Sequence, residues 1–256
     1  MPPLQKDPET IRALFDAIAD RYDLLNAVMS LGIHNFWLKT AVSHTGIKPG
    51  ETVLDVCCGT GMITRELAKI VGPCGMVSGI DLSSNMLRIA QSKTNSRISG
   101  RIRFIQGDAR QLPFADNTFH CAIVGYGIRN VPDPLKLLSE MQRVVKPGGR
   151  IVSLEMSHPR LPLIRKIYQL YLSYGIPGLG KWIAHNEAAY HYLCQSIIQF
   201  CDHNEITNIF HQLGLVKVQC YPLSLGITAV HVGTKANRRT GHGDVLRSNP
   251  LLGIHK

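Results

Sequence analysis

Apolar and β-branched residues along this chain gather in short runs that alternate with stretches of helical periodicity. Five such runs lie at residues 52–56, 76–81, 101–106, 119–124 and 149–155. Helical segments follow most of them, and this alternation is typical of a parallel sheet with helices on both faces. We therefore predict an α/β fold.

Three stretches outside these runs have patterns of their own. Near the N-terminus, Ile11, Leu14, Phe15 and Ile18 follow helical spacing, which predicts an amphipathic helix. Toward the other end, the segments LGLVKVQCYPL and GITAVHVGTK are extended and a turn apart, so we expect a hairpin at the edge of the sheet. The residues at 161–190 are mostly apolar and aromatic with glycine and proline breaks, and we interpret them as a helical insertion over one edge.

These patterns divide the chain into three parts. Residues 1–45 are expected to form an N-terminal helical cap, residues 46–235 the main domain with the insertion, and residues 236–256 a basic, flexible tail. A chain of 256 residues has room for one large domain with such appendages.

Composition narrows the class of protein. Hydrophobic residues make up 45% of the chain and charged residues 18%, which is ordinary for a folded protein. The net charge of +10 would suit nucleic acid or an anionic bilayer, but no helix of the body stacks Lys and Arg beside exposed aromatics, so we expect no nucleic acid partner. The seven cysteines lie mostly in apolar stretches and no apolar run reaches the ~18 residues that cross a bilayer, so we expect a cytoplasmic protein whose membrane contact is at most peripheral.

The stretch VLDVCCGTG places a glycine turn after the first strand, where open α/β sheets bind ligands. Gly59 and Gly61 fit the start of the dinucleotide fingerprint G-x-G-x-x-G, but Thr64 stands where its third glycine belongs, which disfavours a nicotinamide dehydrogenase. No Gly-Lys-Ser/Thr follows, so a P-loop is excluded too. Cys57 and Cys58 lack the spacing of zinc ligands, and we interpret them as small buried wall residues with no metal site.

Acidic residues stand at the ends of the first three strands. Asp55 and Asp81 are about one strand-helix-strand unit apart, so both carboxylates reach the same edge of a parallel sheet. Asp81 has the place of a carboxylate that accepts both hydroxyls of a ribose. Because an acidic rim tolerates a cationic sulfonium better than a phosphate, we predict S-adenosyl-L-methionine as the cofactor. Asp108 and Ala109 follow the third strand, where a carboxylate can accept the adenine amine; the alternative is that Asp108 caps the next turn.

Several longer segments resemble one family of proteins. They are FDAIADRYDLLNAVMSLGIHNFW, LPFADNTF, GYGIRNVPD, EMQRVVKPGGRIVSLEMSHP and YHYLCQSIIQF, together with the glycine turn and AVHVGTK. Over about residues 10–235 the chain is similar to the UbiE/MenG/COQ5 family of quinone C-methyltransferases, which act in menaquinone and ubiquinone synthesis. Methyltransferases in general share the glycine turn and KPGG, whereas RYDLLN and GIRNV are specific.

The resemblance implies a class I S-adenosylmethionine-dependent methyltransferase fold, which is a Rossmann-like, mostly parallel seven-stranded sheet with helices on both faces. It implies methylation of a ring carbon of a prenylated hydroquinone, which converts demethylmenaquinol to menaquinol in menaquinone biosynthesis. The equivalent step on 2-polyprenyl-6-methoxy-1,4-benzoquinol stays open, as does another small aromatic acceptor. A binding module with the same fold and no turnover is the alternative from a different class.

The resemblance also assigns the cofactor site. On the family pattern, Thr60, Asp81, Asp108 and Ala109 contact the cofactor, and we add Asp55 and the turn glycines at 59 and 61. Cysteines at 57 and 58, where many members have glycine, resemble the menaquinone enzymes of Gram-positive bacteria and favour a naphthoquinol acceptor.

Methylation of a ring carbon requires that the neighbouring phenol, with an ordinary pKa of about 10, lose its proton. Arg129 in GIRN is expected to stabilise the phenolate, with Asn130 on a ring oxygen and Tyr22 orienting the ring. A guanidinium is not a base, so water or a histidine would have to take the proton. The candidates by chemistry are the histidines at 34, 158 and 231, and a structural role is the alternative for each of them. The alternatives are that Arg129 is a surface residue paired with Asp133 and that Tyr22 is only helix packing.

The apolar insertion fits a substrate with a long isoprenoid tail. Its aromatics Tyr168, Tyr171, Tyr174 and Trp182 are expected to line a channel toward the membrane. Basic residues at 165, 166 and 181 would then face anionic headgroups, which places the protein peripherally at the inner face of the cell membrane. A helical cap over an ordinary core is the alternative, and a homo-oligomer stays open.

Overall fold

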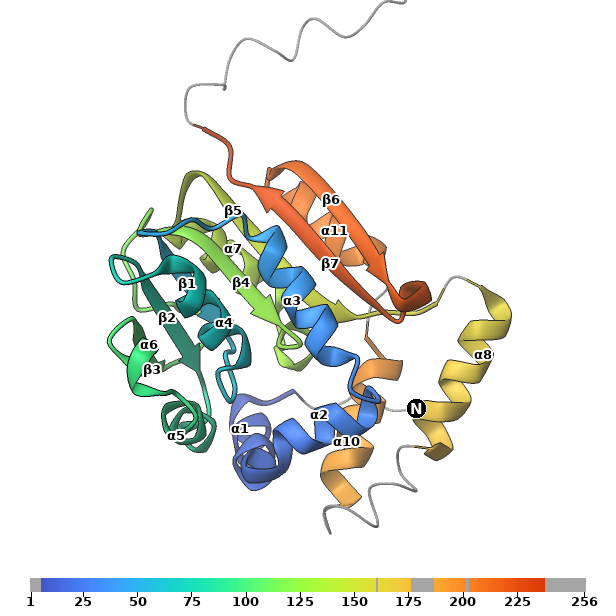
Figure 1. Cartoon of the computed structure of the whole chain (residues 1–256). Helices are drawn as coiled ribbons and strands as arrows, with labels where there is room; N and C mark the ends of the chain where they lie inside the picture. The colour runs from blue at the N-terminus through green and yellow to red at the C-terminus, as the bar shows by residue number, and fades with distance from the viewer. Residues whose placement is uncertain (1–5, 160, 176–186, 201–202, 238–256) are drawn as a thin grey trace, which may run out of the picture.

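Seven strands form one sheet in the computed structural model, which describes residues 6–159, 161–175, 187–200 and 203–237 (Figure 1). Their order across the sheet is β3-β2-β1-β4-β5-β7-β6. The strands are β1 (Thr52–Val56), β2 (Met76–Asp81), β3 (Ile102–Gln106), β4 (Phe119–Gly125), β5 (Val145–Met156), β6 (Val216–Leu223) and β7 (Thr228–Thr234).

The strands β1 to β5 run parallel, and β7 reverses the direction. β1 pairs with β2 and β4, β2 with β3, and β4 with β5 in parallel, whereas β7 is antiparallel to both β5 and β6. The predicted α/β fold with a mostly parallel seven-stranded sheet is confirmed, as is the hairpin at its edge. Because the carboxyl ends of parallel strands meet at one edge, β1 to β5 open onto the same crevice.

Helices flank the sheet on both faces and beyond the strand ends. They are α1 (Pro8–Ile18), α2 (Tyr22–Met29), α3 (His34–His44), α4 (Met62–Val71), α5 (Ser84–Ser92), α6 (Ser96–Ser99), α7 (Pro134–Val144), α8 (Pro162–Leu170), α10 (Glu187–Ile198) and α11 (His203–Gln212), with the short turns η1 (Ala19–Arg21), η2 (Ile128–Asn130), η3 (Tyr171–Gly175) and η4 (Ser224–Gly226).

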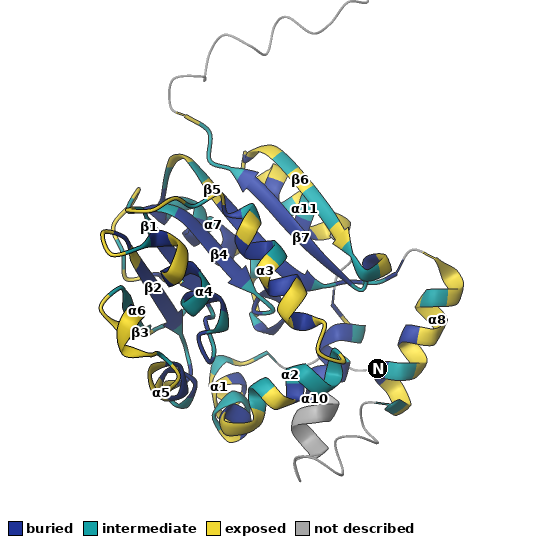
Figure 2. Cartoon of the chain, viewed as in Figure 1, coloured by how far each residue is buried: buried dark blue, intermediate teal, exposed yellow. Residues whose placement is uncertain are grey.

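Two apolar cores hold the helices on the sheet. α3 and α4 lie on one face, where Trp37, Leu67 and Ile123 belong to one core, and α7 and α11 lie on the other, around Leu137 and Phe210 (Figure 1). The inner strands are buried from both sides, as Figure 2 shows in dark blue. Two helical layers therefore explain why the strand sequences are continuous apolar runs instead of alternating ones.

A third apolar core joins segments that are far apart in the sequence. Ile18 and Leu25 of the N-terminal helices pack in one cluster with Met86 of α5, Tyr168 of α8 and Leu193 of α10. In Figure 1 the N-terminal helices and α10 lie beyond the carboxyl ends of the strands. We call α1, α2, α8 and α10 the helical roof, because they cover the crevice at that edge of the sheet.

Carboxylates of the N-terminal helices tie this roof to the body of the fold. Asp16 accepts a hydrogen bond from the Ser83 hydroxyl at 2.5 Å, and Ser83 in turn caps α5. Asp23 accepts the Thr60 hydroxyl at 2.5 Å and pairs with Lys93 at 2.7 Å. These bonds hold α1 and α2 against α5 and the glycine turn, so the roof has a defined position over the strand ends.

The outer side of α8 is apolar and faces solvent. Leu163, Ile167 and Leu170 are 69%, 57% and 61% exposed, and Figure 2 shows most of this helix in yellow. In the part of the chain that the structure describes, no helix is long and apolar enough to cross a membrane. Residues from 238 on in the expected tail, and the expected channel residue Trp182, lie outside the described residues.

Candidate functional site

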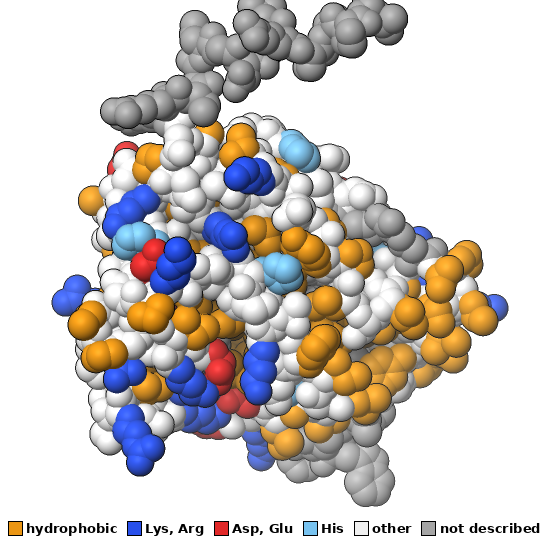
Figure 3. Space-filling model, turned by 45° about the horizontal axis from the view of Figure 1, so that its top comes forward, with side chains coloured by type: hydrophobic (Ala, Val, Ile, Leu, Met, Phe, Trp, Pro, Cys, Tyr) orange, Lys and Arg blue, Asp and Glu red, His pale blue; other side chains and the backbone are white. Residues whose placement is uncertain are grey.

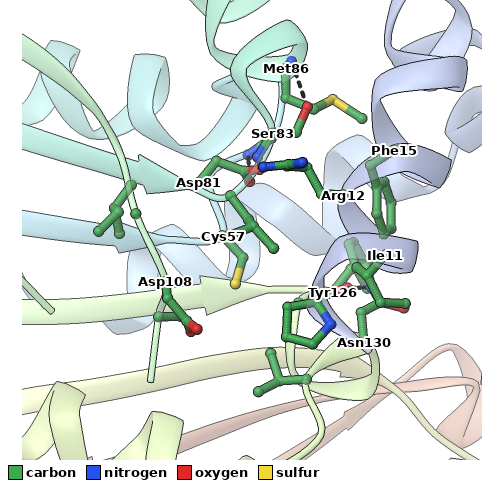
Figure 4. A pocket seen from close by; sticks show the side chains of 18 of the residues that line it. Ile11, Arg12, Phe15, Cys57, Asp81, Ser83, Met86, Asp108, Tyr126 and Asn130 are labelled. Carbon is green, nitrogen blue, oxygen red and sulfur yellow. Dashed lines mark hydrogen bonds between the residues drawn. The ribbon is translucent and has the colours of Figure 1, made fainter. Parts of the chain in front are cut away.

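A cavity opens at the carboxyl ends of β1 to β4, against α1. It encloses about 770 Å³, part of it open to solvent, and we call it the acid-rimmed cavity (Figure 4). Its wall comes from the turns after β1 and β4, the ends of β2 and β3, and the N-terminal helices. The lining residues include Arg12, Phe15, Tyr22, Cys57, Gly59, Asp81, Ser83, Met86, Asp108, Ala109, Tyr126 and Asn130.

Asp81 is the last residue of β2, and backbone groups fix its carboxylate in place. One carboxylate oxygen accepts the Gly59 N–H at 2.8 Å, and the other accepts the Ser83 N–H at 2.9 Å. Burial raises the pKa of Asp81, and these N–H donors counter part of that rise. Each oxygen keeps a lone pair for a further donor. The carboxylate is therefore able to accept two hydroxyl groups of a ligand in this cavity.

The two glycines of the turn after β1 serve different purposes. Gly59 has a φ of 54° and lines the cavity, and a Cβ atom there would lie 3.9 Å from the Tyr22 ring. Gly61 has a φ of 76° and stands at the start of α4, where a Cβ atom would lie 3.1 Å from Ala90 and 3.2 Å from Phe104. Gly59 leaves the cavity side of the turn open, whereas Gly61, which does not line the cavity, permits close packing of α4.

Asp108 and Ala109 form another part of the wall, in the turn after β3. The Asp108 carboxylate accepts the Arg110 backbone N–H at 2.8 Å and pairs with the Arg110 guanidinium at 2.7 Å. Hydrogen bonds from Arg110 lower the pKa of Asp108, so this carboxylate is ionised at neutral pH. The bond from the Arg110 backbone N–H shows that Asp108 caps this turn, which was the alternative expectation. A contact between Asp108 and a ligand stays a prediction.

Besides Gly61, two other residues expected at the cofactor lie outside the wall of this cavity. Asp55 is 1% exposed, and its carboxylate accepts the Thr64 hydroxyl at 2.5 Å. Thr60 is also buried, and its hydroxyl donates to Asp23 of α2. Thr64, which interrupts the dinucleotide fingerprint, therefore serves as the partner of Asp55. For Thr60 and Asp55, a direct contact with the cofactor stays a prediction.

The neighbouring cysteines are buried thiols. Cys57 lines the acid-rimmed cavity with a φ of 55°, and Cys58 is buried next to it. Burial raises the pKa of both thiols, so they stay protonated and poorly nucleophilic at neutral pH. Among the residues that the structure describes, no three His, Cys, Asp or Glu side chains gather as a metal site requires.

A second cavity adjoins the first. It encloses about 1130 Å³, part of it open to solvent, and we call it the apolar cavity. Tyr126, in the turn after β4, lines both cavities, so the two cavities adjoin at this residue. Of the expected channel aromatics, Tyr168 and Tyr171 line this cavity, whereas Tyr174 is exposed. Most of the other lining side chains are apolar, among them Met29, Trp37, Ile164, Ile167, Leu172, Leu193 and Ile197.

Arg129 is buried in the wall of the apolar cavity with a carboxylate partner. It is 4% exposed, and its guanidinium pairs with Glu155 at 2.5 Å while its backbone N–H donates to the other Glu155 oxygen at 3.2 Å. Burial lowers the pKa of Arg129, but the charge and hydrogen bond of Glu155, together with the nearby tyrosines Tyr22 and Tyr192, raise the pKa above its ordinary value, so the guanidinium stays charged. The alternative of a surface arginine paired with Asp133 is wrong, because Asp133 instead caps α7 by accepting the Lys136 N–H at 2.9 Å.

The other candidate catalytic residues line one or the other cavity. Asn130 lines the acid-rimmed cavity, donates to the Tyr126 carbonyl at 3.2 Å and accepts the Tyr192 hydroxyl at 3.1 Å. Tyr22 lines the same cavity, and burial raises its pKa. Of the three candidate histidines, His34 is the one among the described lining residues, in the wall of the apolar cavity. Burial lowers its pKa, which keeps the imidazole neutral at pH 7.

The sequence reasoning missed three residues of the site. Arg12 of α1 extends toward Asp81 in Figure 4, and its place depends on how the amphipathic helix docks. Tyr126 has a φ of 58°, in a turn whose geometry the sequence does not announce. The sequence did carry a signal for Glu155, because it is an acidic residue near the end of a buried strand, as Asp81 is.

The sheet order, the reversed β7 and the cavity at the strand ends define a class I methyltransferase fold. A SAM-dependent methyltransferase from Aquifex aeolicus superposes with a TM-score of 0.57 at 21% identity, over 89% of this chain and 97% of that one. A putative methyltransferase from Haloferax volcanii, in complex with the Trm112 activator, gives 0.62 at 20% identity, over 87% and 98%. At such identities the likeness shows the fold alone.

The family is shown by sequence. The model of the ubiE/COQ5 methyltransferase family matches residues 4–235, so the chain belongs to this family. Demethylmenaquinone methyltransferase of Staphylococcus aureus strain JH9 is 40% identical over 232 residues, which are 91% of this chain and 95% of the relative, and the protein of strain Newman matches equally well. The expected family is confirmed, and with it a methyltransferase that uses S-adenosyl-L-methionine.

The acid-rimmed cavity fits this methyl donor. Asp81 has acceptor capacity left for two hydroxyl groups, as a ribose presents, and Gly59 keeps the turn beside it open. The carboxylates of Asp81 and Asp108 can accept hydrogen bonds from the hydroxyl and amino groups of such a ligand, beside Arg12 and Arg110, which also line the cavity. We therefore expect Asp81, Gly59, Asp108 and Ala109 to hold the donor.

The buried Asp55 predicts a pH dependence of stability. Burial raises the pKa of Asp55 from 3.8 to about 7, so the folded chain holds a proton that the unfolded chain releases between about pH 4 and pH 7. The free energy of unfolding therefore falls across this window as pH rises. We expect Asp55→Asn to remove this slope, so that the stability of the variant relative to the unsubstituted chain rises by about 2 kcal/mol from pH 5.5 to pH 8.

Urea unfolding of both proteins at the two pH values measures this difference. Asp20→Asn is the matched control, because the Asp20 carboxylate is exposed and its variant should differ from the unsubstituted chain by the same amount at both pH values. A difference for Asp55→Asn that does not change with pH would contradict the assignment.

Proposed function

We propose that this protein transfers a methyl group from S-adenosyl-L-methionine to a ring carbon of a prenylated hydroquinone, converting demethylmenaquinol to menaquinol. The observation that carries the proposal is the junction of the two cavities at Tyr126, with the charged Arg129 in the wall of the apolar one. One cavity suits a cationic donor, and the other suits an apolar acceptor with an acidic hydroxyl. The name of the Staphylococcus aureus relatives supports a naphthoquinol ring.

The chemistry divides between the two cavities. When bound, S-adenosyl-L-methionine supplies an electrophilic methyl group at the Tyr126 junction. The ring carbon beside the acceptor hydroxyl becomes nucleophilic once that hydroxyl has lost its proton, and it must then lie about 3 to 3.5 Å from the methyl carbon and in line with the bond that breaks. Tyr22 and Asn130, which line the acid-rimmed cavity near this junction, orient the two reactants in our proposal.

Arg129 makes the deprotonated form of the acceptor accessible near neutral pH. An unperturbed phenol has a pKa of about 10, and an apolar cavity alone would raise it further. A fixed positive charge in that cavity opposes this effect and stabilises the phenolate. Glu155 holds the guanidinium through one nitrogen and leaves the Arg129 Nε without a hydrogen-bond partner among the described residues. This N–H is a donor that a ring oxygen can use.

The apolar cavity accommodates the isoprenoid tail, and the exposed side of α8 supports contact with a bilayer in this proposal. Figure 3 shows hydrophobic side chains gathered on the right-hand side of the molecule, where α8 lies. Ile167 of α8 is both exposed and part of the cavity wall, so the mouth of the cavity lies beside this surface. Arg165 and Lys166 are exposed on the same helix, which favours anionic lipid.

Two variants separate donor binding from methyl transfer. Asp81→Ala should weaken donor binding about a hundredfold or more, because it removes a charged acceptor of two hydroxyl groups. Arg129→Lys keeps a cation beside Glu155 and should leave the donor affinity within about threefold, but lower kcat about ten- to a thousandfold, because the guanidinium N–H toward the acceptor is lost. Isothermal titration with S-adenosyl-L-methionine and turnover of a short-tailed hydroquinone measure the two effects. Equal loss of donor binding in both variants would refute this division.

Membrane contact is tested by charge on the outer side of α8. The double variant Leu163→Asp/Leu170→Asp changes two exposed residues that do not line either cavity. We expect it to lose binding to vesicles of anionic phospholipid and to lose turnover of an acceptor embedded in them, while turnover of a short-tailed acceptor in solution is unchanged.

Met76→Asp is the matched control for this experiment. Met76 is also an exposed apolar residue, 41% exposed, but it begins β2 and lies at the opposite end of the strand from the cavities. It should leave vesicle binding unchanged. If both variants bind vesicles as the unsubstituted chain does, α8 is not the membrane surface.

A further inference from the structure

The apolar cavity contains a second buried hydrogen-bond donor without a partner. Tyr168 of α8 is 7% exposed and lines the cavity, and its hydroxyl makes no hydrogen bond to the described residues. Most buried hydroxyl groups in folded proteins have a partner, because burying one without a partner costs free energy. An unpartnered hydroxyl in a cavity wall is therefore a donor that a bound ligand can use.

Two neighbouring hydroxyl groups do not share this property. The Tyr171 hydroxyl, one helical turn further along, donates to the Met29 carbonyl at 3.2 Å. The Ser224 hydroxyl accepts the Trp37 ring N–H at 2.8 Å. The Tyr126 hydroxyl also has no hydrogen-bond partner among the described residues, but Tyr126 lines both cavities and so stands where they adjoin. Away from Tyr126, the buried donors without a partner in the described wall of the apolar cavity are the Tyr168 hydroxyl and the Nε of Arg129.

We propose that the Tyr168 hydroxyl donates a hydrogen bond to the ring oxygen of the hydroquinone that lies beside the prenyl chain. This inference rests on the proposed function. A hydroquinone carries two ring oxygens on opposite sides of the ring, and away from Tyr126 the described wall of the apolar cavity offers two donors without partners. Arg129 takes the oxygen beside the carbon that is methylated, because it lies in the turn next to Tyr126, where the donor cavity begins. Tyr168 lines only the apolar cavity, and in this proposal the tail leaves the ring on that side.

The state of the hydroxyl fits this role. Burial raises the pKa of Tyr168, and the charge of Arg129 counters only part of the rise, so the hydroxyl keeps its proton and remains a donor. The position of Tyr168 on α8 also gives the insertion a purpose in recognising the ring. Ile164 and Ile167 of α8 and Tyr171 of η3 line the same cavity, so consecutive turns of the insertion hold the tail and the ring in this proposal.

The experiment compares Tyr168→Phe with the unsubstituted chain. We expect kcat/KM for a prenylated naphthohydroquinone to fall about ten- to a hundredfold, because a hydrogen bond to an ionisable ring oxygen is lost. The affinity for S-adenosyl-L-methionine should be unchanged. The melting temperature without acceptor should be equal or higher, because the variant removes a buried hydroxyl that has no partner.

Tyr221→Phe is the control, since it removes a hydroxyl that donates to Gln219 at 2.7 Å and lies outside the walls of both cavities. It should leave kcat/KM within about threefold. A second acceptor, which lacks the ring hydroxyl beside the prenyl chain, completes the test. The unsubstituted chain should turn it over more slowly, whereas Tyr168→Phe should scarcely distinguish it from the full hydroquinone.

Three results would overturn the inference. They are a kcat/KM for Tyr168→Phe within threefold of the unsubstituted chain, the same fractional loss with both acceptors, or a loss of activity that parallels a loss of melting temperature. In each case turnover by the unsubstituted chain leaves the proposed function standing. If the unsubstituted chain turns over no hydroquinone, the proposed function fails and this inference fails with it.

Discussion

The buried ion pair between Arg129 and Glu155 is the interaction on which the geometry of this site depends. Moving an ion out of water costs several kcal/mol, so a guanidinium in the wall of an apolar cavity persists only beside a fixed partner of opposite charge. Glu155 meets this requirement because β5 holds it, and it binds both the guanidinium and the backbone N–H of Arg129. The pair therefore links the end of β5 to the turn after β4, where the two cavities meet.

Charge is divided between the two cavities in a way that suits two unlike molecules. Asp81, fixed by two backbone N–H groups, makes one cavity favourable for a cationic ligand. Arg129 makes the other favourable for an apolar ligand that acquires negative charge. Both depend on the helical roof, because Asp16 and Asp23 hold α1 and α2 against Ser83 and the glycine turn. Thr60 therefore helps to position the roof through its bond to Asp23. A contact between Thr60 and the cofactor stays a prediction.

The sequence predicted those features that depend on local pattern and failed where distant contacts decide. Four of the first five strands lie within one residue of the apolar runs, and only β5 begins earlier, at Val145. The place of Asp81 could be predicted because the last residue of a parallel strand lies at the crevice in this topology. Asp55 carries the same signal, but a bond to Thr64 within the fold takes up its carboxylate. Arg12 owes its place to the docking of α1 over the strand ends, and no local pattern announces such docking. Tyr168, by contrast, was expected to line a channel, and it lines the apolar cavity.

The most direct test of the two-cavity account is a crystal structure of the protein with S-adenosylhomocysteine and a short-tailed naphthohydroquinone bound together. The account predicts the ribose hydroxyls on Asp81, the sulfur directed toward Tyr126, and the ring beside Arg129 in the apolar cavity. A donor product bound outside the acid-rimmed cavity, or a ring bound away from Arg129, would contradict it.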